Sequence, residues 1–100
     1  MEFRRGILFV RLKGELTRYT CKSLENYLLP LIDKHGIKYL VCNLGALKTI
    51  DTDGKDTLKK GVAAARKNYG DGVLCNTNQT LGNDFKIYDN ELVALSKIKI

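Results

Sequence analysis

The stretch IKYLVCNLGALKTIDTDG, residues 37–54, decides the fold of this chain. Its first part, up to Asn43, is almost entirely apolar, as expected for a central strand that is covered on both faces. A polar turn over residues 49–54 then precedes a helical pattern. Two carboxylates and a hydroxyl therefore lie where the first N–H groups of a helix have no partners, a position that suits an anionic side chain or a phosphate.

Two regular segments precede this stretch. Residues 7–13, ILFVRLK, are rich in β-branched and aromatic side chains and predict a strand that ends at Gly14. Between Thr20 and Gly36 the apolar residues recur at helical spacing, with a capping hydroxyl at one end and a glycine at the other. Pro30 lies inside this helix and predicts a kink.

The pattern continues after the turn. Apolar positions spaced four, three and four predict an amphipathic helix over residues 55–69, and residues 73–75 predict a short core strand. Weaker patterns predict a short helix over 77–80, an edge strand over 85–88 and a final helix over 91–95. Alternating strands and helices of this length predict βαβ crossovers and a small α/β sheet.

Length and composition indicate one globular domain over residues 1–100, with 44% apolar residues. No apolar run approaches the roughly 20 residues that cross a bilayer. The N-terminal arginines precede an apolar stretch, as in a signal peptide, but Arg11 and Lys13 interrupt it and no small-residue cleavage site follows. We expect a cytoplasmic protein.

The net charge of +6 is compatible with an acidic partner, nucleic acid or an anionic membrane, and it does not distinguish between these partners.

Motifs for catalysis, cofactors and metals are missing. The chain has no phosphate-binding glycine loop, no nucleophile elbow and no paired cysteines, and its single histidine, His35, lies where it favours the end of a helix dipole. Cys42 and Cys75 lie in apolar runs and are expected to act as small hydrophobes. Asp51 and Asp53 supply too few ligands for a metal ion, and helix capping explains their position. We expect no catalytic residue, cofactor or metal.

Basic residues crowd the helix predicted after the turn. Interleaved aromatic residues, which single-stranded nucleic acid needs for stacking, are lacking apart from Tyr69, and Asp56 and Asp71 interrupt the charge. This pattern favours a solvated helix that faces a protein partner over a nucleic-acid site. The basic residues concerned are Lys55, Lys59, Lys60, Arg66 and Lys67.

These segments together resemble a known family. GILFVRLKGELTRYT, then IKYLVCNLGALKTIDTDG, then GVLCN resemble the STAS domain, the sulfate transporter and anti-sigma factor antagonist domain. In length the chain is similar to the free-standing bacterial anti-sigma factor antagonists. The resemblance implies a mixed sheet of four to five strands with helices mainly on one face. Its most specific residues are Asn43, Leu44, Leu47, Ile50, Asp51 and Gly54, together with Gly14, Glu15, Leu16 and Thr20.

The resemblance also implies a partner and a site. In phosphorylatable members the acceptor follows the aspartate of the turn, and an anti-sigma factor that is also a serine kinase binds the turn and the next helix. The unphosphorylated antagonist holds the anti-sigma factor and frees the sigma factor. Phosphorylation breaks that complex, and a phosphatase restores it. Here the acceptor position is Thr52. The implied contact surface comprises Asp51, Thr52, Asp53, Gly54, Lys55, Lys59 and Lys60.

Two departures leave the mechanism open. Thr52 stands where the antagonists resemble serine, and Asp53 stands where they have a small hydroxyl residue. The protein is thus a switch at Thr52, a switch that Asp53 biases towards release, or a module that needs no phosphorylation. The alternative function is an accessory STAS subunit of a transporter or a signalling scaffold. In each case we expect a monomer or weak dimer without a small-molecule substrate.

Overall fold

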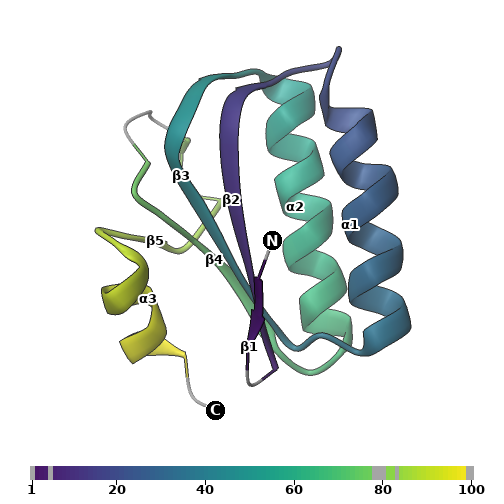
Figure 1. Cartoon of the computed structure of the whole chain (residues 1–100), viewed down its shortest axis with the longest axis vertical. Helices are drawn as coiled ribbons and strands as arrows, with labels where there is room; N and C mark the ends of the chain where they lie inside the picture. The colour runs from purple at the N-terminus through teal and green to yellow at the C-terminus, as the bar shows by residue number, and fades with distance from the viewer. Residues whose placement is uncertain (1, 5, 78–80, 83, 99–100) are drawn as a thin grey trace.

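A five-stranded mixed sheet forms the centre of the molecule, with the strands in the spatial order β1-β2-β3-β4-β5 (Figure 1). The strands are β1 (Glu2–Arg4), β2 (Ile7–Leu16), β3 (Tyr39–Ile50), β4 (Asp71–Cys75) and β5 (Ile87–Tyr88). Strand β1 is antiparallel to β2, and the other neighbours are parallel. The computed structural model describes residues 2–4, 6–77, 81–82 and 84–98.

Helices cover both faces of this sheet unequally. The long helices α1 (Cys21–His35) and α2 (Thr52–Lys67) lie side by side on one face, and the short α3 (Glu91–Lys97) lies on the other (Figure 1). The larger core, between the sheet and α1 and α2, includes Leu8, Val10, Leu28, Ile32, Leu40, Cys42, Leu58, Ala65 and Leu74. The smaller core, beneath α3, comprises Ile7, Phe9, Val41, Val73, Cys75 and Ala94.

Alternation along the strands explains how both cores form. Successive strand side chains point to opposite faces, so β3 places Leu40 and Cys42 under the long helices and Val41 under α3. All three side chains are buried, as the apolar run in the sequence predicts. The predicted fold class, a small α/β domain with a mixed sheet and helices mainly on one face, is confirmed.

Two predicted strand ends are wrong. Strand β2 passes through Gly14 (φ 76°) with shifts in register and ends at Leu16 instead, since a glycine at positive φ accommodates the irregularity. Strand β3 does not end at Asn43. Beyond that residue it loses its β4 neighbour but keeps pairing with β2 as far as Ile50. The apolar run stops at Asn43 because the part of β3 after this residue is more exposed, although the strand continues.

The helix boundaries follow local chemistry. Helix α1 continues through Pro30 and ends at Gly36, which has φ 58° as a helix C-terminus favours. Helix α2 begins three residues before its predicted start, at Thr52, because Asp51 caps it. It ends at Lys67 and not at Tyr69. The edge strand and the final helix near the C-terminus are confirmed as β5 and α3, whereas the helix predicted over 77–80 lies mostly outside the described residues.

Glu91, the first residue of α3, attaches that helix to the sheet. Its carboxylate accepts hydrogen bonds from Arg11 Nε and Nη2, both at 2.9 Å, and from Asn43 Nδ2 at 2.7 Å. The Arg11 and Asn43 bonds lower the pKa of Glu91. Asn43 Oδ1 also accepts the Gly45 N–H, at 2.9 Å. Asn43 therefore has a structural role, joining β3 to α3.

The cysteines behave as the sequence predicts. Cys21, Cys42 and Cys75 are free and buried. Burial raises the pKa of Cys42 to about 12 and that of Cys75 to about 11, so both remain neutral thiols at pH 7.

His35 lies in the last turn of α1, as expected. Among the described residues, no helix has the length and apolar character that crossing a membrane would require.

Candidate functional site

Asp51 joins three segments at the start of α2. Its Oδ1 accepts the Gly54 N–H and its Oδ2 accepts the Arg18 N–H, each at 2.9 Å. Its own N–H donates to Leu16 O at 3.3 Å. The hydrogen bonds from Gly54 and then Arg18 lower the pKa of Asp51, so the group is a carboxylate at neutral pH. The predicted capping role of Asp51 is confirmed, and its oxygens are engaged within the domain.

Only glycine fits at position 54, because the backbone of Leu16 approaches it closely. A Cβ atom at this position would lie 2.1 Å from Leu16 O and 3.0 Å from Ile50 Cγ1. The first turn of α2 therefore packs directly against the end of β2, and a side chain would force the two apart. Gly54 is buried, so it shapes the site and does not form its surface.

Thr52 and Asp53 occupy the first two positions of α2, and both are exposed. Within the described ranges, neither side chain has a hydrogen-bond or ion-pair partner. The positive end of the helix dipole favours an anion here, which suits the Asp53 carboxylate. The structure thus presents a free hydroxyl and a fixed negative charge side by side.

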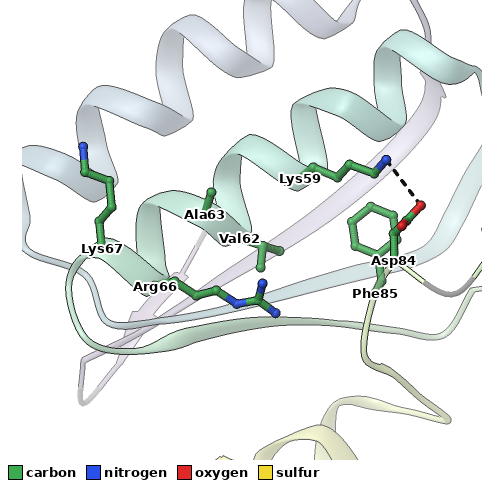
Figure 2. Close-up of a pocket in the computed structure, with 7 residues that line it drawn as sticks. All are labelled: Lys59, Val62, Ala63, Arg66, Lys67, Asp84 and Phe85. Atoms are coloured by element: carbon green, nitrogen blue, oxygen red, sulfur yellow. Dashed lines mark ion pairs between the residues drawn. The ribbon is translucent and has the colours of Figure 1, made fainter.

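The lysines of the predicted contact surface point in different directions. Lys60 Nζ lies 2.8 Å from Glu25 Oε1 of α1, and this bond lowers the pKa of Glu25. Lys59 Nζ lies 3.3 Å from Asp84 Oδ2, on the side away from α1 (Figure 2). Lys55 lies one turn before Lys59 and has no such pair in the described part of the chain. These lysines therefore do not form a single patch with Thr52.

The loop between β2 and α1 adds two residues that the sequence analysis did not select. Tyr19 is 79% exposed, and the Arg18 guanidinium lies 4.8 Å from its ring centroid. Arg18 Nη2 also donates to Tyr19 Oη at 2.6 Å. The Arg18 N–H bond to Asp51 places this pair beside Thr52. Tyrosine and arginine are enriched at the centres of protein interfaces. The Arg-Tyr pair in a short loop was therefore the feature of the sequence that could have indicated a contact surface here.

The match to a protein family covers nearly the whole chain. Residues 1–93 match the model of the STAS domain. The chain belongs to the STAS domain family. Within the described residues of this STAS domain, no group of three His, Cys, Asp or Glu side chains is placed to hold a metal ion.

Individual proteins resemble the chain over all or nearly all of its length. An anti-sigma F factor antagonist from Paenibacillus polymyxa is 28% identical over 109 aligned positions, covering 100% of this chain and 93% of that protein. The solved structure of the anti-sigma factor antagonist SpoIIAA in its unphosphorylated form has a TM-score of 0.79 at 18% identity, covering 97% of this chain and 93% of the other. The phosphorylated form of SpoIIAA, a Bacillus cell fate determinant, has a TM-score of 0.72 at 17% identity, covering 97% and 95%. These structural likenesses show a shared fold.

Replacing Gly54 tests the close approach of α2 to β2. We expect Gly54→Ala to lower the free energy of unfolding by at least about 2 kcal/mol, because the new methyl group meets the backbone at Leu16. Urea unfolding followed by circular dichroism measures this change. Gly61→Ala is the matched control in the same helix, since its methyl group would meet only the ends of Leu40 and Leu28. A loss for Gly54→Ala no larger than that of the control would contradict the packing argument.

Replacing Asp51 tests the charged cap. Because the folded pKa of Asp51 is lowered, its stabilisation is fully present above the unfolded value of about 4 and is lost as the pH falls through the folded pKa. We expect Asp51→Ala to melt below the wild type at pH 7, and the two melting temperatures to converge as the pH is lowered below 4. Asp53→Ala is the control: its side chain forms no hydrogen bond within the described residues, so the variant loses only the helix-dipole contribution and should melt closer to the wild type at pH 7. A melting difference independent of pH would rule out the charged cap.

Proposed function

We propose that this STAS domain is an anti-sigma factor antagonist, a regulatory module that binds an anti-sigma factor that is also a serine kinase and thereby releases a sigma factor. The observation that carries the proposal is the exposed Thr52 hydroxyl in the first turn of α2, next to the Asp51 cap. The full-length relative named as an anti-sigma F factor antagonist supports the same function. Under this proposal Thr52 and Asp53, with Lys55 and the exposed Arg18–Tyr19 pair, contribute the contact surface.

Phosphate on Thr52 would change this surface electrostatically. A phosphothreonine carries a charge of about −1.5 to −2 at pH 7, beside the fixed charge of Asp53. In the free domain, the N-terminus of α2 and solvent accommodate these charges. In a closed interface the same charges lose water and repel any carboxylate opposite them, so the complex is weakened. Release of the partner follows from this difference between the free and bound states.

Asp53 supports a second candidate. Its carboxylate is exposed next to Thr52 and has the sign of a phosphate without needing a kinase. A partner that accepts this charge permanently would need no switch at Thr52. That property fits an accessory STAS subunit of a transporter or a signalling scaffold, and co-purification with a permease or an ATPase instead of a kinase would favour it.

The switch is tested at Thr52. After incubation of the domain with a candidate anti-sigma kinase of the same host and ATP, peptide mass spectrometry should place phosphate on Thr52. We expect Thr52→Ala to bind the kinase as the wild type does and Thr52→Glu to bind about tenfold more weakly or worse, measured by calorimetry. Ser96→Glu is the control, because Ser96 is exposed on α3, on the opposite face of the sheet from α2 (Figure 1). Binding unaffected by Thr52→Glu would exclude the switch.

The charge beside the acceptor is tested separately. We expect Asp53→Ser to tighten binding of the same kinase about two- to fivefold, because an exposed carboxylate is removed from the interface. Asp33→Ser removes an exposed carboxylate at the far end of α1 and should leave the affinity unchanged. Binding of no host anti-sigma kinase by either the wild type or Asp53→Ser would overturn the proposed function itself.

A further inference from the structure

A groove runs along the side of α2 that faces away from α1. Its apolar surface is formed by Val62, Ala63 and Phe85, with Lys59 near one end and Arg66 near the other (Figure 2). The groove has a volume of about 540 Å³, within the range of roughly 300–1,000 Å³ that is typical of ligand sites. Neither the charged cap at Asp51 nor the Thr52 hydroxyl belongs to it, so the proposed function leaves it unexplained.

Arg66 is oriented at this groove by an ion pair with Asp71. Its Nε donates to Asp71 Oδ1 at 3.0 Å, and Asp71 also accepts the Gly72 N–H and Lys86 Nζ. Burial raises the pKa of Asp71, but the bonds from Lys86, Gly72 and Arg66 outweigh burial and lower it, so Asp71 is a carboxylate. In the described ranges the two Nη atoms of Arg66 have no partner. A guanidinium in this state can bind a carboxylate through both nitrogens.

Two residues of the chain itself, Asp84 and Phe85, already lie at the groove. Asp84 pairs with Lys59 at 3.3 Å (Figure 2). The next residue, Phe85, packs against the larger core. One acidic residue followed by one apolar residue therefore already lies against α2. Lys59 and Arg66 are seven positions apart, which corresponds to about 10 Å along a helix, or about three residues of an extended chain. A second acidic-apolar segment would thus reach Arg66 while its apolar side chain covered Ala63.

We propose that this groove binds an extended acidic peptide segment of a protein partner, with a carboxylate on Arg66 and an apolar side chain against Val62, Ala63 and Phe85. The net charge of +6 complements such a segment. A nucleic acid fits less well because Asp84 lines the groove, Asp71 is paired with Arg66, and Phe85, the one aromatic ring among the described lining residues, is half-buried. Arg66 is 14 positions from Thr52, or about 21 Å along the helix, so the two surfaces can be tested separately.

A synthetic peptide tests the site without any assumption about the natural partner. The probe is a fluorescein-labelled ten-residue peptide that alternates glutamate with leucine. Its controls are the lysine-leucine peptide, the glutamate-serine peptide and a single-stranded DNA of ten nucleotides. We expect the probe alone to bind at low salt, with NMR shift changes at the amides of Val62, Ala63, Arg66 and Phe85, and with weaker binding as salt is added. Shift changes confined to residues 51–55, or none, would overturn the proposal, as would equal binding of the lysine peptide or tighter binding of the DNA.

Variants assign the binding to the groove. We expect Arg66→Gln to weaken the probe about tenfold and Arg66→Lys to weaken it less, because lysine keeps the charge but loses the planar fork. Lys48→Gln removes an exposed lysine of β3 and should change the affinity less than about twofold. Because Arg66→Gln also removes a bond to Asp71, Ala63→Glu serves as a second test: it adds a carboxylate at an exposed position in the groove and should abolish binding. Unchanged affinity in both Arg66→Gln and Ala63→Glu would refute the site.

Discussion

The surface around Thr52 depends on the hydrogen bonds that are accepted by the Asp51 carboxylate. This carboxylate accepts one backbone N–H from the first turn of α2 and one from the β2–α1 loop, so a single side chain sets the position of both segments. The missing side chain at Gly54 lets α2 approach Leu16 closely enough for those bonds to form. Neither residue needs to touch a partner to control the surface, because together they determine where Thr52 and Tyr19 stand.

The strand register explains why these distant segments meet. Leu16 pairs with Ile50 at the ends of β2 and β3, so the loop before α1 and the start of α2 leave the same edge of the sheet. The carboxyl ends of parallel strands are where open α/β sheets usually carry their binding sites. The long pairing of β2 with β3 has a further consequence. Both connections lie beyond the part of the sheet that β4 joins, and they expose Arg18 and Tyr19 on one side and Thr52 and Asp53 on the other.

Local patterns predicted what local chemistry controls. The periodicity of apolar residues was sufficient to predict α1, α2 and the buried halves of β2 and β3, and the cap at Asp51 follows from residue type and position. Long-range contacts account for the failures. The second half of β3 is a strand because β2 pairs with it, although its own residues lack the apolar run of a central strand. Likewise, the pairing of Lys60 with Glu25 and of Lys59 with Asp84 depends on contacts 35 and 25 positions apart, which helical spacing alone does not reveal.

Asp53 has different consequences for the free domain and for a complex. In the free domain its carboxylate lies in the first turn of α2, where the helix dipole typically stabilises a negative charge by about 0.3–1 kcal/mol. Folding therefore does not select against it. In a complex the same group must lose part of its hydration, and the cost depends on what the partner places opposite it. A basic residue on the partner would turn Asp53 into an attractive contact, whereas an apolar or acidic surface would make it repulsive. The charge at this position is thus compatible with the fold and acts on the choice of partner.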